Sequence, residues 1–248
     1  KGTDDDGFIW YFSFGANMDK HTLQKRRGVI PRESRACKVP GYGIVFDLPG
    51  IMYLEPAFAS ITPLKDTNLP SGVVHGVAHL ITKDDYIHKI VATEGGNGHE
   101  GHGYATIDVV CEDYNGNTFT AKALSTYPQR SRSGFLPSHR YLQLLRRGAK
   151  EHNLDTTWIE YLNSLEHYQH DLKTRLGAVF SIMTALFLVI PFFILNLLMA
   201  KVFKVKTPRI FVEYMTFLTA AIWFLHDHIF APLFGSGKCN TDRKLKNA

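Results

Sequence analysis

Cysteine is scarce in this chain of 248 residues, and the three cysteines form no recognisable pattern. Cys37, Cys111 and Cys239 lie far apart, are odd in number and include no Cys-x-x-Cys pair. They therefore predict neither a disulfide framework nor a zinc site, which suits a reducing compartment. We expect Cys37 and Cys111 to serve as small apolar core residues.

Strong charge of either sign is also missing. The chain has 28 Lys and Arg residues against 23 Asp and Glu, a net charge of +5, and no basic run interleaved with aromatic residues. Nucleic acid is therefore not an expected partner. No cationic region precedes the first apolar stretch, so we expect no secretory signal, and residues 1–7 are expected to be a disordered lead-in.

Well-known catalytic and cofactor motifs are absent as well: there is no GxSxG, no Walker loop and no dinucleotide-binding fingerprint. Two histidine pairs could suggest a metal. His99 and His102 share a short loop, whereas His75 and His79 lie on an expected strand, where about 13 Å would separate them. Neither pair has a third ligand cluster beside it, so we expect no metal and no other cofactor.

Residues 11–18, with the sequence Tyr-Phe-Ser-Phe-Gly-Ala-Asn-Met, join an apolar strand to a glycine turn and the start of a polar helix. Backbone N–H groups in such a turn point outward together and can bind an anion or a polarised carbonyl. Gly15 lets a ligand approach the main chain, and Asn17 offers side-chain hydrogen bonds. The pattern alone leaves open a turn that binds nothing.

A second candidate site follows an expected helix over residues 84–93. Glu94 enters a glycine-rich loop, 95–103, where the backbone can approach a substrate, and Tyr104 comes directly after that loop. A carboxylate in a partly desolvated pocket has a raised pKa and can transfer protons near neutral pH. The alternative is a surface Glu at a helix end.

Short apolar runs separated by turn residues predict an α+β fold, namely a small mixed β-barrel with flanking helices. Asn115-Gly116 joins two of the expected strands in a hairpin, and Ser138 caps an expected helix. The expected strands cover residues 8–14, 34–40, 42–48, 53–63, 72–81, 104–111 and 118–124, and the later helices 140–150 and 158–167. These elements predict one domain over residues 8–172.

The composition changes after Arg175. Residues 176–200 carry no charge and exceed the roughly 20 residues that cross a bilayer, with Pro191 as an expected kink. Residues 210–234 are a second apolar stretch, which either crosses back or lies in the interface. We therefore expect residues 173–248 to be a membrane anchor with a basic tail, transmembrane helices and a lipid bilayer as partner, and the preceding domain to face the cytosol.

At this point the segments together resemble the γ-glutamylcyclotransferase family. Residues 11–18 resemble its opening signature YFxYGSNM, and the later pieces follow in the family's order: Pro-Gly-Tyr at 40–42, Ala-Ser-Ile-Thr-Pro at 59–63, Glu94-Gly95, and Gly-Ala-Lys-Glu at 148–151. The resemblance covers roughly residues 8–170. It implies a small β-barrel enzyme that cyclises a γ-glutamyl group to 5-oxoproline and releases an amine, without metal or cofactor.

The resemblance also implies roles for individual residues. Glu94 is the expected proton carrier, and a backbone turn is expected to hold the developing oxyanion. The expected substrate-binding residues are Phe12, Phe14, Gly15, Ala16, Asn17, Met18, Tyr104 and Tyr141.

Two positions depart from the family signature, because Phe14 and Ala16 replace its Tyr and Ser. This substitution removes two side-chain donors and leaves an alternative open, a catalytically weak or inactive binding module anchored to a membrane. The apolar C-terminal part further resembles fungal family members of gliotoxin-like (epidithiodioxopiperazine) toxin biosynthesis. That resemblance implies a glutathione-derived γ-glutamyl intermediate as the substrate.

Overall fold

A computed structural model describes residues 7–64, 72–94, 104–203 and 209–240. It divides into two compact units. The first contains the chain up to Gly50 together with Ala57–His167, and the second contains Ile51–Pro56 together with the chain from Tyr168 onward. Most of the expected lead-in, residues 1–6, lies outside the described residues, as does the loop at 95–103.

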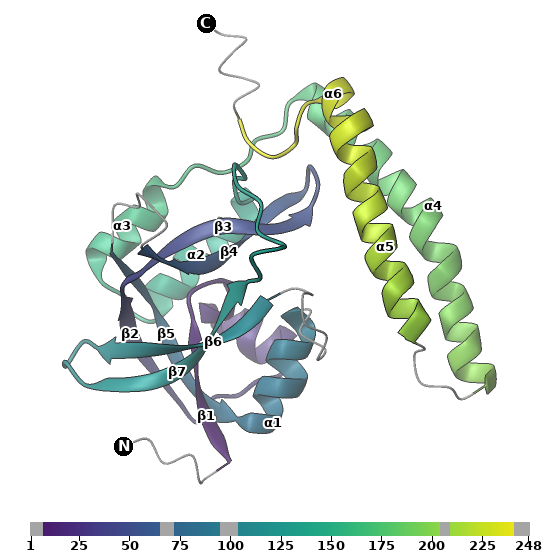
Figure 1. Cartoon of the computed structure of the whole chain (residues 1–248). Helices are drawn as coiled ribbons and strands as arrows, with labels where there is room; N and C mark the ends of the chain where they lie inside the picture. The colour runs from purple at the N-terminus through teal and green to yellow at the C-terminus, as the bar shows by residue number, and fades with distance from the viewer. Residues whose placement is uncertain (1–6, 65–71, 95–103, 204–208, 241–248) are drawn as a thin grey trace, which may run out of the picture. The chain divides into compact units, whose positions relative to one another are not determined.

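The first unit is built on a closed five-stranded barrel in the order β1-β5-β2-β6-β7 (Figure 1). β1 pairs with β5 antiparallel and with β7 in parallel, so the barrel mixes both pairings. This confirms the mixed β-barrel expected from the sequence. The strands are β1 (Phe8–Ser13), β2 (Glu33–Pro40), β5 (Val73–Thr82), β6 (Tyr104–Asp113) and β7 (Thr118–Thr126).

A separate two-stranded sheet and several helices accompany the barrel. β3 (Tyr42–Ile51) pairs with β4 (Glu55–Pro63), and α2 (His139–Glu151) is followed by α3 (Thr156–Ser164). Ser138 caps α2, as expected, because its side chain accepts a hydrogen bond from the Tyr141 N–H. Shorter helical segments are a π-helix at His21–Arg26, α1 (Lys83–Asp85), a π-helix at Tyr86–Val91 and a 3₁₀ turn at Ala92–Glu94.

The core of this unit lies inside the barrel and beneath α2 and α3. Phe12, Cys37, Val77 and Cys111 are buried there, in agreement with the small apolar role expected for the two cysteines. Gly76 of β5 lets the barrel close tightly, since an added Cβ would lie 2.4 Å from the Ser13 carbonyl oxygen.

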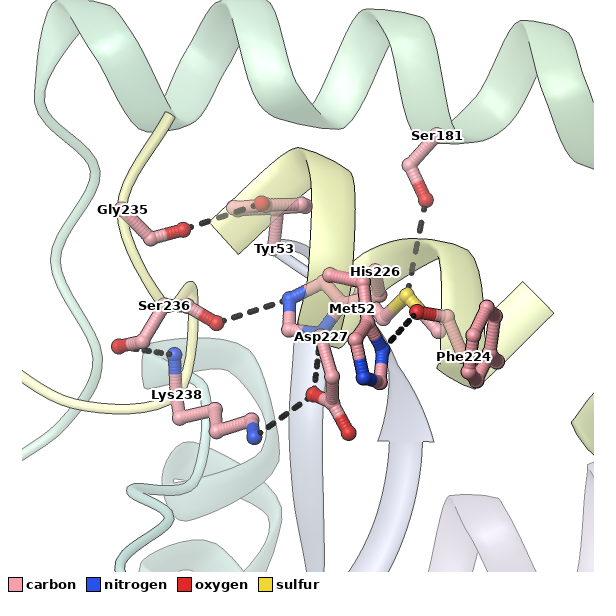
Figure 2. Close-up of polar contacts among 10 residues, drawn as sticks. Met52, Tyr53, Ser181, Phe224, His226, Asp227, Gly235, Ser236 and Lys238 are labelled. Carbon is pink, nitrogen blue, oxygen red and sulfur yellow. Dashed lines mark hydrogen bonds and ion pairs between the residues drawn. The ribbon is translucent and has the colours of Figure 1, made fainter. Parts of the chain in front are cut away.

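The second unit consists of helices and the tip of the β3–β4 hairpin. Its helices are α4 (Leu172–Phe203), α5 (Arg209–Leu225), a π-helix at His226–Phe230 and α6 (Ala231–Phe234), and α4 and α5 lie side by side (Figure 1). Tyr53, at the hairpin tip, is fully buried. Its hydroxyl donates to the Gly235 carbonyl at 3.0 Å (Figure 2).

A polar cluster closes the end of this unit. The Nε2 of His226 lies 2.9 Å from the Ser236 carbonyl oxygen, and because a carbonyl only accepts, that nitrogen carries the hydrogen (Figure 2). Asp227 contacts both the Nδ1 of His226 and the Nζ of Lys238. Burial lowers the pKa of His226, and the hydrogen bond to Asp227 opposes that shift.

The expectation of membrane-spanning helices is wrong. Across the residues that the structure describes, no helix combines the length and the apolar character that crossing a bilayer requires. The second expected span is not one helix, because α5 has 17 residues, about 25 Å at 1.5 Å per residue, and gives way to a π-helix at His226. The membrane anchor, the lipid partner and the membrane localisation that rested on these spans are withdrawn with them.

The start of α4 shows why an uncharged run misled the interpretation. Its first turns pack against protein: an added Cβ at Gly177 would lie 2.9 Å from the ring of Tyr53, and the hydroxyl of Ser181 lies 3.8 Å from the sulfur of Met52 (Figure 2). Hydropathy counts apolar residues, but it does not distinguish a side chain that faces lipid from one that packs against a neighbouring strand.

Candidate active site

A cavity of about 400 Å³ lies in the first unit, where β1 ends. This volume is within the range of small-molecule sites. The turn after β1, strand β4, the end of the helical segment before residue 95, and α2 all contribute to its walls. Its lining includes Tyr11, Ser13, Phe14, Gly15, Ala16, Asn17, Arg26, Arg27, Phe58, Ala59, Thr93, Glu94, Tyr104, Arg140 and Tyr141.

The turn after β1 is a short 3₁₀ helix, Ala16–Met18. The carbonyl of Gly15 accepts from the Met18 N–H at 3.1 Å, and the carbonyl of Ala16 accepts from the Asp19 N–H at 3.1 Å. Gly15 has no room for a side chain, since a Cβ there would lie 2.9 Å from the Tyr141 hydroxyl. Glycine at this position therefore lets the turn and the Tyr141 hydroxyl approach each other closely in the cavity lining.

Asp19 fixes the far side of this turn. Its carboxylate is fully buried, accepts from both the N–H and the hydroxyl of Thr22, and pairs with Arg147 on α2. Burial raises the pKa of Asp19, but the hydrogen bonds from Arg147 and Thr22 outweigh burial and lower it to about 2. Asp19 is therefore ionised at neutral pH, and its bonds to Thr22 and Arg147 hold the end of the turn in place.

Glu94 lines the same cavity as the turn. Its Oε1 accepts from Arg27 Nη2 at 2.6 Å and lies 3.5 Å from the Asn17 side-chain nitrogen. Asn17 in turn donates to the Tyr11 hydroxyl at 3.0 Å. Asn17 thus links the turn to the carboxylate, although the two lie 77 positions apart in the sequence.

The pKa of Glu94 is raised. Burial is the largest cause, while the charge of Arg27 and the hydrogen bond from Asn17 oppose it. A carboxylate whose pKa is brought toward neutrality can both accept and return a proton at physiological pH. The site therefore places a carboxylate suited to proton transfer in the same cavity as residues 14–17 of the turn.

Two tyrosines complete the walls by bonding to the same backbone unit of β4. Tyr104 donates its hydroxyl to the Ala59 carbonyl at 2.7 Å, and the Ala59 N–H donates to the Tyr141 hydroxyl at 3.1 Å. Burial raises the pKa of Tyr104, so its phenol stays protonated.

The structure brings most of the expected site residues together. Phe14, Gly15, Ala16, Asn17, Glu94, Tyr104 and Tyr141 all line the one cavity. Phe12 and Met18 do not line it, because both are fully buried in the adjoining core. The substrate-binding role of each residue stays a prediction.

Sequence reasoning missed Arg27, Asp19 and the hydrogen-bonding function of Ala59. Arg27 lies in the basic run Lys25-Arg26-Arg27, a pattern that is typical of a helix C-terminus and does not point to a carboxylate partner. Its pairing with Glu94 has no local sequence signal, because the two residues lie 67 positions apart.

His79 and His75 of the first unit have structural partners. His79 lies 2.9 Å from the Ser34 hydroxyl, and burial lowers its pKa to about 3, with His152 contributing to the shift. His75 stacks on Trp158. Within the described ranges no three His, Cys, Asp or Glu residues gather as metal ligands, and His99 and His102 lie outside those ranges.

The barrel with its helical cover defines a class of protein. A human protein described as uncharacterized has the same fold, with a TM-score of 0.55 and 19% identity over 67% of this chain and 92% of its own. A solved γ-glutamyl cyclotransferase superposes with a TM-score of 0.54 and 17% identity, over 69% of this chain and 98% of its own. At such identities the likeness establishes the fold alone.

Sequence relatives establish the family, although no family model matches the chain. The γ-glutamyl cyclotransferase gliK of Aspergillus fumigatus is 30% identical over 262 aligned positions, covering 94% of this chain and 90% of that protein. The gliK protein of Claviceps purpurea is 29% identical, covering 89% and 99%. The chain belongs to the γ-glutamyl cyclotransferase family, which confirms the family and the enzyme class expected from its sequence.

Proposed function

We propose that the chain cleaves a γ-glutamyl amide by intramolecular attack, releasing 5-oxoproline and a free amine, with Glu94 carrying the proton. The observation that carries this proposal is the placement of Glu94. Its carboxylate lines the same cavity as the turn after β1 and contacts Asn17 of that turn. A carboxylate and the glycine-containing turn thus line one small space.

The reaction needs these two components and no co-reactant. The substrate's α-ammonium gives a proton to Glu94, and the freed amine attacks the γ-carbonyl carbon of the same molecule. The C–N bond to the leaving amine then breaks as that nitrogen takes up a proton from Glu94. Over the whole reaction the α-nitrogen loses two protons and the leaving nitrogen gains two, so the proton count balances.

The geometry supports this mechanism in two ways. Ring closure within one molecule removes the entropic cost of bringing two reactants together, so holding the glutamyl chain bent contributes much of the acceleration. Charge develops on the γ-carbonyl oxygen during attack, and fixed N–H donors of the turn from Gly15 to Asn17 would stabilise it. Loss of the family's Tyr and Ser at Phe14 and Ala16 leaves those backbone donors in place.

The proposed substrate is a glutathione-derived γ-glutamyl intermediate of fungal toxin biosynthesis. Arg26 and Arg140 line the cavity, which favours a substrate with more than one carboxylate. A glutathione conjugate has the α-carboxylate of its glutamyl group and the carboxylate of its glycine. A plain γ-glutamyl amine has only the first.

The test is 5-oxoproline release by the full-length protein from γ-glutamyl dipeptides, glutathione and S-substituted glutathione. We expect release by the parent, faster on the glutathione conjugates. We expect Glu94→Gln to lower kcat/KM by about a thousand-fold, since the amide cannot accept the proton.

The matched control is Glu160→Gln, which makes the same chemical change on the exposed surface of α3 and should leave the rate within about two-fold. Background rates on every substrate, for parent and variant alike, would favour the alternative of a binding module in which Phe14 and Ala16 have abolished catalysis. Full activity of Glu94→Gln would instead remove Glu94 from the mechanism.

A further inference from the structure

The ion pair between Arg27 and Glu94 lies in the cavity, but the steps of the proposed cyclotransferase reaction do not use it. Arg27 closes the polar segment after the turn, and its Nη2 lies 2.6 Å from Glu94 Oε1. The side chains of Arg27 and Glu94 are about three-quarters or more buried, at 25% and 20% exposure. An ion pair this close to the proton carrier has to affect how that carrier works.

The Arg27–Glu94 ion pair involves only one of the two carboxylate oxygens of Glu94. Both contacts of Glu94 within the described chain, from Arg27 and from Asn17, fall on Oε1. Oε2 therefore remains to exchange a proton with a substrate. Arg27 is committed to Glu94 in the same way, because Glu94 is its one carboxylate partner among the described residues and its Nε is buried without a hydrogen-bond partner there.

The chemistry requires Glu94 to be ionised before the substrate's ammonium arrives. Burial alone favours the neutral acid, which cannot accept a proton. A guanidinium is suited to oppose burial, because it stays charged at every working pH and binds a carboxylate along a fixed direction. Arg26 cannot replace it, because that side chain lines the cavity without an ion pair to any carboxylate in the described ranges.

We propose that Arg27 is a positioning residue that keeps Glu94 in its carboxylate form and fixes Oε1, so that Oε2 is the atom that takes the proton. This inference rests on the proposed function of Glu94 and adds a second residue to it. Arg27 does not touch the reacting atoms in this mechanism. It acts through the charge and the orientation of Glu94.

The first experiment measures the pH profile of kcat/KM for the full-length parent, Arg27→Met, Arg27→Lys and Arg26→Met. An opposite charge at this distance shifts a carboxyl pKa by about one unit or more, so we expect Arg27→Met to move the acidic limb upward by about one pH unit. The loss should approach ten-fold at pH values below both midpoints and should largely disappear at high pH. Arg27→Lys should recover much of the shift, because it retains the charge.

Arg26→Met is the matched control. It removes a charge from the same cavity lining, so its KM should rise, but we expect the acidic limb of its pH profile to stay within about 0.3 pH units of the parent. A loss of equal size at every pH in Arg27→Met, or an increase of KM alone, would overturn the proposal, because it would assign Arg27 to folding or to substrate binding.

The second experiment separates this inference from the proposed function. The carboxyl carbon of Glu94 is titrated by NMR in glutamate-labelled protein without substrate, with Glu94→Gln providing the assignment. The midpoint should rise by about one unit in Arg27→Met. An unchanged midpoint overturns the role of Arg27 even if the enzyme is active. A shifted midpoint together with an absence of 5-oxoproline release overturns the proposed reaction alone.

Discussion

Among single residues, Asp19 shows how a site can depend on a group that never meets the substrate. It ends the turn that faces the cavity, and its carboxylate joins the Thr22 backbone to Arg147 on α2. A buried carboxylate with these partners is favourable only while it is ionised. The shape of the turn is thereby tied to a charge.

Asp19→Asn should therefore destabilise the protein, and its effect should depend on pH. The pKa of Asp19 falls from about 4 in the unfolded chain to about 2 in the folded one. A lowered pKa adds stability that is complete above about pH 4 and is lost as the pH falls toward 2. Because Arg147 is half exposed, we expect a loss of about 1–2 kcal/mol at pH 7 that shrinks toward zero near pH 2.

Urea unfolding at pH 7 and at pH 3 measures that difference. Asp84→Asn, a change of the same kind at the exposed start of α1, is the control and should alter stability by less than about 0.5 kcal/mol. If Asp19→Asn lowers the free energy of unfolding by the same amount at both pH values, the destabilisation comes from steric effects of the amide and not from the missing charge.

Among elements, α2 determines how closely helix and turn approach. Gly148 lies on its buried face, and an added Cβ would lie 2.6 Å from the Met18 Cβ and 2.8 Å from the Asp19 nitrogen. One of these neighbours is backbone, which cannot move aside cheaply. The absence of a side chain at Gly148 therefore lets α2 press against the turn that lines the cavity.

Gly148→Ala should lower both stability and activity. Alanine favours the helix by about 1 kcal/mol, but overpacking against the turn costs about 1–3 kcal/mol. We expect a net decrease of Tm by several degrees and a larger relative decrease of kcat/KM, since the turn itself is displaced. Lys150→Ala, an exposed position of the same helix, should leave both nearly unchanged, and an equally stable, fully active Gly148→Ala would contradict this account.

The barrel strands were predictable because apolar alternation and the Asn115-Gly116 turn are local signals. Part of the cavity lining was predictable for the same reason, because residues 14–17 and Glu94 lie in recognisable segments. Arg27 was not, because nothing in the chain between positions 27 and 94 encodes their distance in space. The membrane prediction failed on a related point, since hydropathy cannot see that Gly177 and Ser181 pack against Tyr53 and Met52.

At the scale of the whole molecule, the β3–β4 hairpin connects the two units through the chain itself. Most of its length belongs to the barrel unit, while its tip, Ile51–Pro56, belongs to the helical unit. The buried Met52 and Tyr53 have their partners on α4 and on the segment around Gly235 and Gly237. Removing the helical unit would therefore leave an apolar hairpin tip without its partners.

A chain ended after His167 should accordingly retain the barrel but bind an apolar dye and aggregate, because Met52 and Tyr53 become exposed. Replacing both with Ser in the shortened chain should reduce dye binding and restore a monodisperse protein, as measured by fluorescence and light scattering. If the shortened chain is already monodisperse and does not bind dye, the hairpin tip does not depend on the helical unit.

The same hairpin tip is synthesised long before the residues that cover it. Tyr53 and its hydrogen-bond partner Gly235 are 182 positions apart. At ribosomal rates, Tyr53 is therefore synthesised about 10–40 s before Gly235, whose carbonyl accepts its hydrogen bond. The barrel's last strand is complete well before that interval ends. A nascent chain therefore carries an unsatisfied apolar tip through most of its translation, and that tip is where a chaperone would be expected to bind.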